Sequence, residues 1–164
     1  MLRRFGVVSL LDAPCGDCGW ISDLDIDLSY IGVDIVPDLI DELHRREQHR
    51  GTPRSYLLAD ITRDPLPRAD AILCRDCLVH LSFANIAAAL ANFRRSGSEW
   101  MITTTFPELK ANVDCEDGDW RPLNFALTPF NWPAPVEVLV EGCTEGDGGW
   151  ADKSLAVWRI AELP

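Results

Sequence analysis

The chain has 164 residues, of which 47% are apolar, as is usual for one soluble globular domain. Its 26 acidic and 15 basic side chains give a net charge of −11 at pH 7. Such a charge repels phosphate backbones, so we expect no nucleic-acid partner. No apolar run approaches the ~20 residues that a membrane-spanning helix requires, so we expect no membrane partner. These features predict a cytoplasmic protein with reduced cysteines, and they leave open whether it forms a homodimer.

Apolar runs and helical patterns alternate along the first two thirds of the chain. The predicted strands, which are apolar or β-branched runs, cover residues 7–11, 31–33, 56–59, 71–74 and 100–105. One predicted helix opens at Pro37 and is capped by Gly51, and another begins after the N-cap Ser82. The predicted buried face of that second helix consists of Ile86, Leu90 and Phe93. Continuous apolar strands that alternate with helices predict an α/β fold, a mostly parallel sheet with helices on both faces.

The pattern changes after residue 105. Residues 106–135 contain recurrent prolines and no helical pattern, and long ordered loops of this kind are usually functional. Two further strands, residues 136–140 and 155–160, are predicted to form an antiparallel edge of the sheet. The sequence shows no internal repeat and no second domain, so we interpret residues 1–164 as a single domain.

Two acids at strand ends point to a cofactor site. The first apolar run ends in Asp12 and leads into a turn that contains Gly16 and Gly19, while the second run ends in Asp34. In α/β folds, a strand that leads into a glycine-bearing loop marks the place where nucleotide-like cofactors bind. An acid at the end of the second strand holds the ribose hydroxyls in such folds.

The charge of this loop discriminates between cofactors. The loop has no lysine followed by Ser or Thr, which a P-loop requires. A dinucleotide loop uses three glycines, and Asp17 would repel a pyrophosphate. S-adenosylmethionine carries no phosphate; Asp12 and Asp17 can attract its ammonium group, and backbone donors can bind its carboxylate. The loop therefore favours S-adenosylmethionine.

With these motifs, the chain resembles the class I S-adenosylmethionine-dependent methyltransferases over nearly its whole length. Residues 12–18, D-A-P-C-G-D-C, occupy the place of the family motif D-x-G-x-G-x-G. Residues 73–82, L-C-R-D-C-L-V-H-L-S, resemble the segment that follows the fourth strand and faces the substrate. Together with Y-I-G-V-D-I-V at residues 30–36, they are similar to a bacterial subgroup of small methyltransferase-domain proteins. The resemblance implies methyl transfer and a Rossmann-like, seven-stranded, mostly parallel sheet with an antiparallel last strand.

The resemblance also implies which residues bind the cofactor. The loop at residues 12–17 would hold the methionine part, Asp34 the ribose, and Asp60 with Ile61 the adenine. Asp12 has a second plausible role as a structural acceptor for loop amides, and Trp20 could instead pack on the sheet. The predicted cofactor-binding residues are Asp12, Ala13, Pro14, Cys15, Gly16, Asp17, Trp20, Asp34, Ile35, Asp60, Ile61 and Arg75.

The chain departs from the family pattern in two respects. Pro14 and Cys18 stand where glycines are usual; proline fixes the turn, and we expect a negative φ at Cys18. The sequence also begins almost at the first strand, whereas family members generally have a helical segment before it. We therefore expect the N-terminal covering helix to be missing.

The candidate catalytic residues follow the fourth strand. His80 lies where a substrate hydroxyl could lose a proton, and Asp76 is an alternative base or substrate anchor. His80 could equally orient the loop before Ser82, because many methyl transfers need only proximity and alignment.

The loop after the fifth strand supplies candidate acceptor-binding residues. Aromatic, arginine and amide side chains suit a small polar acceptor such as a sugar, although the aromatic residues could equally fill the core beneath a long loop. We predict a hydroxyl acceptor on a small molecule or glycan. The predicted substrate-binding residues are Glu108, Trp120, Arg121 and Asn124.

Two other functions stay open at this point. The pairs Cys15-x-x-Cys18 and Cys74-x-x-Cys77 could together bind zinc or an iron–sulfur cluster if neighbouring strands carry them. They are too far apart in the sequence for a zinc ribbon, so no metal site is predicted. The other alternative is a methyltransferase fold without catalysis that serves as a scaffold or as a partner subunit.

Overall fold

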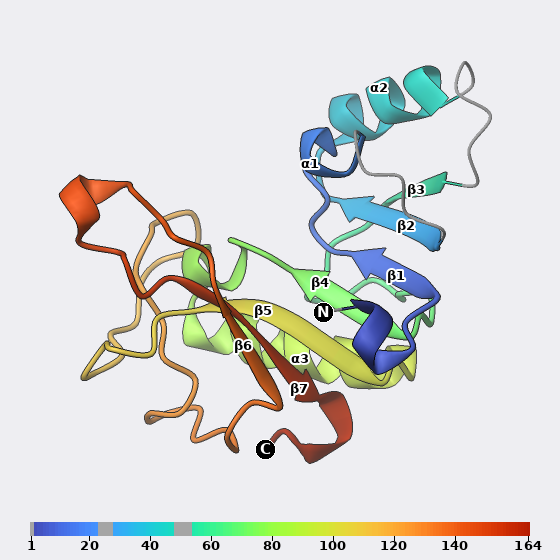
Figure 1. Cartoon of the computed structure of the whole chain (residues 1–164). Coiled ribbons are helices and arrows are strands. Elements are labelled where there is room, and N and C mark those ends of the chain that lie inside the picture. Colours follow the sequence, from blue (N-terminus) through green and yellow to red (C-terminus); the bar gives the residue numbers. More distant parts are fainter. Residues whose placement is uncertain (1, 23–27, 48–53) are drawn as a thin grey trace.

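A seven-stranded sheet forms the centre of the molecule (Figure 1). The computed structural model describes residues 2–22, 28–47 and 54–164. The order of the strands across the sheet is β3-β2-β1-β4-β5-β7-β6. The strands are β1 (Ser9–Asp12), β2 (Ser29–Asp34), β3 (Arg54–Leu58), β4 (Ala71–Cys74), β5 (Trp100–Thr105), β6 (Glu137–Val140) and β7 (Ser154–Arg159).

The strand directions confirm the predicted topology. Strands β1 to β5 pair in parallel, and β7 pairs antiparallel with both β5 and β6. Along β4 and β5 every residue is buried, as expected for strands covered on both faces. The chain leaves β1 toward β2 on one side, and β4 lies on the other side. In open α/β sheets, such a reversal forms a crevice outside the carboxyl ends of the two strands, and ligands bind there.

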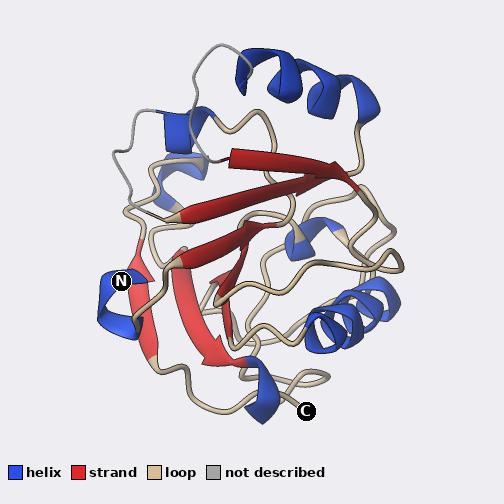
Figure 2. Cartoon of the chain, turned by 90° about the vertical axis from the view of Figure 1, so that its right-hand side faces the viewer, coloured by secondary structure: helices blue, strands red, loops and turns tan. Residues whose placement is uncertain are grey.

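Helices cover both faces of the sheet, as predicted (Figure 2). One face packs against the 3-10 helix η1 (Leu2–Phe5), α1 (Gly19–Ser22) and α2 (Pro37–Glu47), and the other packs against α3 (Phe83–Ser96). Successive residues of a strand point to opposite faces, so Leu10 belongs to the first core and Leu11 to the second. None of the helices in the described part of the chain has the length and apolarity needed to cross a bilayer.

The helix boundaries follow local chemistry. The Ser82 hydroxyl accepts a 3.3 Å hydrogen bond from the Asn85 N–H and caps α3, which ends at Gly97 with φ +75°. The N-cap Ser82 and the buried face of α3 agree with the sequence-based prediction. Helix α2 begins at Pro37 as predicted, while its predicted cap, Gly51, lies outside the described residues.

The long segment between β5 and β6 packs on the face covered by α3. Phe125 stacks on Trp132 with ring centroids 4.1 Å apart and an interplanar angle of 14°, and Trp132 meets Trp158 of β7 edge to face at 5.0 Å. Phe125, Phe130 and Trp132 are buried. These aromatic residues therefore fill the core. The first half of the segment, which includes Trp120, lies over the carboxyl end of the sheet.

Candidate active site

The loop after β1 closes on the end of β2. Asp34 accepts the Gly16 N–H at 3.1 Å with Oδ2 and the Val36 N–H at 3.1 Å with Oδ1. The Cys15 N–H donates to the Val33 carbonyl at 2.8 Å. Two segments that the sequence singled out separately therefore meet at the crevice. A Cβ added to Gly16, whose φ is +54°, would meet no heavy atom within 4 Å, so this part of the loop faces open space.

Asp12 lies beneath this loop. Its Oδ2 accepts the Tyr30 hydroxyl at 2.7 Å and the Trp20 Nε1–H at 3.1 Å. Burial raises the pKa of Asp12 to about 6, although both hydrogen bonds favour the charged form. Asp12 is therefore a structural acceptor, but for two side chains and not for the loop amides that the sequence suggested. Trp20 remains 40% exposed.

The backbone at Cys18 differs from expectation. Its φ is +56°, so the expected negative φ is wrong and Cys18 adopts the left-handed conformation that favours glycine. Its N–H closes a turn to the Cys15 carbonyl at 3.2 Å, and its sulfur lies 3.3 Å from the Tyr30 hydroxyl oxygen. These contacts hold the residue in a conformation that costs about 1–2 kcal/mol.

A cavity of about 230 Å³ lies at the ends of β2 and β3. Ile35 and Leu58 line it and are 58% and 55% exposed, which is unusual for two neighbouring large apolar side chains. Asp60 also lines it; its Oδ1 accepts the N–H and the hydroxyl of Thr62, which lowers its pKa. The Asp34 carboxylate precedes the exposed side chain of Ile35 in the chain. An acid beside such an apolar surface suits a ribose that is joined to a flat base. Ile61 instead points into the core.

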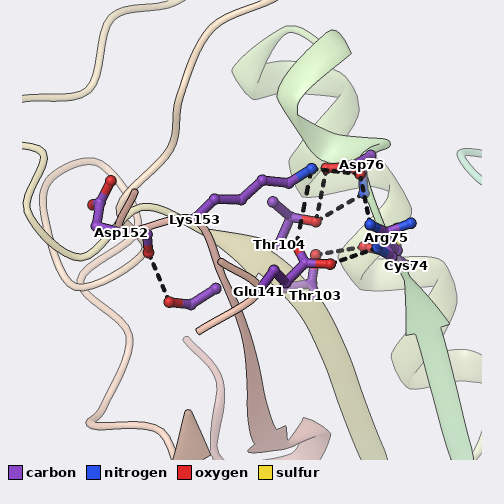
Figure 3. A network of polar contacts seen from close by, with 9 residues as sticks. Cys74, Arg75, Asp76, Thr103, Thr104, Glu141, Asp152 and Lys153 are labelled. Atoms are coloured by element: carbon purple, nitrogen blue, oxygen red, sulfur yellow. Dashed lines mark hydrogen bonds and ion pairs between the residues drawn. The ribbon is translucent and has the colours of Figure 1, made fainter. Parts of the chain in front are cut away.

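A polar network connects the end of β4 to β5, β6 and β7 (Figure 3). Asp76, with φ +51°, receives the Thr104 hydroxyl on Oδ1 at 3.2 Å and the Lys153 ammonium on Oδ2 at 2.8 Å. Arg75 donates to Glu141 at 2.8 Å. Sequence reasoning missed Lys153 and Glu141, because no local motif marks them; the strand order alone brings them to Asp76.

A second cavity, of about 300 Å³, opens at this network. Trp120, one of the four predicted substrate-binding residues, and Asp76, one of the two predicted catalytic residues, line it. Trp150 and Lys153 were not predicted. The lining residues are Asp76, Phe106, Trp120, Cys143, Glu145, Trp150 and Lys153.

His80 lies in the 3-10 helix η2 (Leu78–His80) and is outside the lining of this cavity. Its Nδ1 lies 3.0 Å from the carbonyl oxygen of Asp119. A carbonyl only accepts hydrogen bonds, so Nδ1 carries the proton and Nε2 keeps its lone pair in the neutral ring. His80 therefore orients the loop and still presents a basic nitrogen.

The other predicted substrate-binding residues lie outside the cavity lining. Arg121 is buried; its guanidinium donates to the Leu78 carbonyl at 2.9 Å, to the Val113 carbonyl at 3.2 Å and to Leu81. The Asn124 amide donates to two further carbonyls, and the Glu108 N–H donates to Asp152 at 2.8 Å. Arg121 and Asn124 therefore hold the loop that carries Trp120.

The cysteine pairs lie in different parts of the core. Cys15 and Cys18 belong to the core beneath α1 and α2, whereas Cys74 belongs to the core on the α3 face. Within the described ranges, no three His, Cys, Asp or Glu residues gather as a metal site. The sheet itself keeps the two pairs apart, so the structure gives the metal-binding alternative no support.

Comparison with known proteins agrees with this geometry. A family described as "Methyltransferase domain" matches residues 10–97, which is more than half of the chain. The chain belongs to this methyltransferase domain family, and the resemblance to the class I enzymes is confirmed. None of the curated proteins compared with the chain matches it.

Solved structures share the fold. One is the 1,6-didemethyltoxoflavin-N1-methyltransferase of Burkholderia thailandensis, with bound 1,6-didemethyltoxoflavin and S-adenosylhomocysteine. It is 17% identical to this chain with a TM-score of 0.68, and the match covers 96% of this chain and 73% of the Burkholderia chain. A protein of Pyrococcus horikoshii OT3 is 16% identical with a TM-score of 0.67, covering 92% and 81%.

Other matches are to longer proteins. An S-adenosylmethionine-dependent methyltransferase from Clostridium acetobutylicum is 15% identical with a TM-score of 0.54, and the match covers 66% of this chain. The chain spans only 48% of that protein and 33% of an O-methyltransferase from neocarzinostatin biosynthesis.

Proposed function

We propose that this chain binds S-adenosylmethionine and transfers its methyl group to a hydroxyl of a small-molecule or glycan acceptor. The observation that carries the proposal is the position of Asp34. Its carboxylate is fixed at the end of β2 by the Gly16 and Val36 N–H groups, beside the exposed Ile35. Family membership and the S-adenosylhomocysteine bound to the Burkholderia protein support the same cofactor.

Each part of the cofactor has a matching surface. Every carboxylate oxygen of Asp34 accepts one N–H and keeps a lone pair for a ribose hydroxyl. Ile35 and Asp60 would border the adenine, and the loop at residues 13–17 would offer backbone N–H groups to the methionine carboxylate. Arg75 and Trp20 would border the methionine part beside this loop. When bound, S-adenosylmethionine supplies a methyl group on a positively charged sulfur that leaves readily.

The chain's own contribution to the reaction is alignment and removal of a proton. The crevice between β1 and β4 would place the acceptor oxygen in line with the methyl–sulfur bond. The proton of the hydroxyl would pass to the Asp76 carboxylate or to Nε2 of His80, which both follow β4. A positioned base of this kind contributes roughly 10²–10⁴-fold to a rate.

Calorimetric titration with S-adenosylhomocysteine tests the proposal. We expect saturable binding, weakened by a factor of about ten to a hundred in Asp34→Ala, because hydrogen bonds to a charged acceptor are worth roughly 1.5–3 kcal/mol. The matched control is Asp41→Ala, an exposed acid on α2, which should bind as the unaltered chain does. A folded chain that does not bind S-adenosylhomocysteine would overturn the proposal and favour a non-catalytic scaffold.

A further inference from the structure

The 300 Å³ cavity has an aromatic wall and a charged end. Trp120 and Trp150 meet edge to face with ring centroids 4.8 Å apart, and Phe106 packs against both at 6.1 and 5.7 Å. Phe106 is 2% exposed and forms the floor, while Trp120 remains 44% exposed. A tryptophan held in this way by two other rings offers a fixed flat surface to a ligand.

The charged end consists of Lys153 and Asp76. Lys153 reaches from the start of β7 to Asp76, and its side chain is only 14% exposed (Figure 3). Its ammonium group also lies 3.9 Å from Glu141. The carboxylate of Asp76 remains 37% exposed, so this pair is sheltered on the lysine side and open toward the cavity on the aspartate side.

We propose that this cavity binds an uncharged aromatic alcohol of the phenol class as the methyl acceptor, and that Lys153 is a catalytic residue that stabilises the developing oxyanion. This inference rests on the proposed function and makes it more specific. The ring would stack on Trp120, and its hydroxyl would reach the Lys153–Asp76 pair.

The size of the cavity favours a small flat acceptor. Ligand pockets start at roughly 300 Å³, so this cavity suits a compound of about one or two rings better than an oligosaccharide. Offset or edge-to-face contact between aromatic rings adds about 0.5–1.5 kcal/mol beyond burial, which favours an aromatic ring over a saturated ring of the same size.

The charge of the lining favours an acceptor without a carboxylate or phosphate. Asp76 and Lys153 neutralise each other, and among the described residues Glu145 forms no ion pair. One negative charge is therefore left over at the cavity, in a chain whose net charge is −11. An anionic acceptor would be repelled by the remaining charge at the cavity and by the net charge of the chain.

The chemical step balances with the groups present. The phenol proton passes first to Oδ2 of Asp76, and the phenolate oxygen that remains then forms a bond to the carbon of the transferred methyl group. The carbon–sulfur bond breaks, and its electron pair stays on sulfur, which becomes a neutral thioether. The Lys153 ammonium lies 2.8 Å from the same Oδ2, so it is close enough to hydrogen-bond the oxygen that gains negative charge.

The experiment uses three probes with the whole chain: naphthol, its saturated analogue decahydronaphthol, and hydroxynaphthoic acid. Binding of S-adenosylhomocysteine is measured first by calorimetry, which tests the proposed function separately. With S-adenosylmethionine, we expect naphthol to be methylated and to give a kcat/KM at least about tenfold above either analogue. Equal or reversed preference in a chain that binds S-adenosylhomocysteine would overturn the phenol assignment and leave the proposed function standing. If S-adenosylhomocysteine does not bind, the proposed function and the phenol assignment are both overturned.

Two variants test the residues. Lys153→Met should lower kcat on naphthol at least about tenfold with unchanged S-adenosylhomocysteine affinity, because an oxyanion donor is worth roughly 10²–10³-fold in a sheltered site. The matched control is Lys110→Met, which removes an exposed lysine outside the cavity. Trp120→Leu, a change at a half-exposed ring, should raise KM for naphthol several-fold and tests the cavity if Lys153→Met does not fold. Unaltered kinetics in both variants would overturn the inference.

Discussion

The Tyr30 hydroxyl in β2 donates a 2.7 Å hydrogen bond to the carboxylate of Asp12 at the end of β1. The Trp20 indole donates to the same carboxylate oxygen at 3.1 Å. Desolvation nevertheless raises the pKa of Asp12 from 3.8 to about 6. The acid that begins the cofactor loop is therefore part of a buried contact between two strands, and its charge is coupled to the stability of the fold.

This coupling predicts a pH dependence that Asp12→Asn removes. A carboxyl whose pKa is higher in the folded state stabilises that state below about pH 4 and loses this contribution as the pH rises through about 6. The change corresponds to about 2–3 kcal/mol. Asparagine keeps an oxygen for Tyr30 and Trp20, so the stability of the variant relative to the unaltered chain should increase by that amount between pH 4 and pH 7. Urea unfolding across this range measures it, and parallel curves for the two proteins would contradict it.

Gly32 in β2 is expected to be intolerant of any side chain. A Cβ at this position would lie 2.8 Å from Cδ1 of Tyr56 and 3.0 Å from the Cys15 sulfur. Overpacking of this kind costs about 1–3 kcal/mol, so Gly32→Ala should lower the free energy of unfolding by this amount. Ser29→Ala, at an exposed position of the same strand, serves as the control and should have little effect. Equal unfolding midpoints for the two variants would disprove the close approach.

Arg121 is expected to act through the loop and not through the substrate. Its guanidinium donates to the carbonyls of Leu78, Leu81 and Val113, so Arg121→Met would remove three charge-assisted hydrogen bonds from a buried position. We expect a loss of about 2–4 kcal/mol in the free energy of unfolding. Arg121→Lys should rescue little, because an ammonium cannot span the same three carbonyls. The exposed Arg3→Met is the control in the same denaturation assay, and a stable Arg121→Met that lost only acceptor binding would favour the sequence-based prediction.

Asp76 and His80 are expected to differ in their effect on the reaction. Asp76 lines the proposed acceptor cavity and His80 does not, so Asp76→Asn should lower kcat by about 10²-fold and His80→Gln by less than about tenfold. Asparagine tolerates the positive φ of Asp76, which makes it the appropriate replacement. S-adenosylhomocysteine binding should be unchanged in both variants. The opposite order of effects would assign the proton transfer to His80.

Much of the fold could be predicted because it depends on local patterns. The apolar runs mark the strands of the sheet, Ser82 marks the start of α3, and Pro37 opens α2. The acids Asp12, Asp34 and Asp60 stand at or just after strand ends, and parallel strands present those ends at one edge. Their placement along the carboxyl edge of the sheet follows from the periodicity of the sequence and the topology of parallel sheets.

The sequence by itself therefore determined the fold class, the family and the edge of the sheet that carries the cofactor loop, because each is encoded over short stretches of chain. Only the tertiary structure decided the cavity of about 300 Å³ beside Asp76. Lys153 meets Asp76 because β7 inserts antiparallel between β5 and β6, a pairing between residues far apart in the sequence. Tertiary contacts also turned Arg121 and Asn124 toward backbone carbonyls and fixed Cys18 at a positive φ. Burial and hydrogen bonding outweigh local preference at these positions, and no local pattern records that outcome.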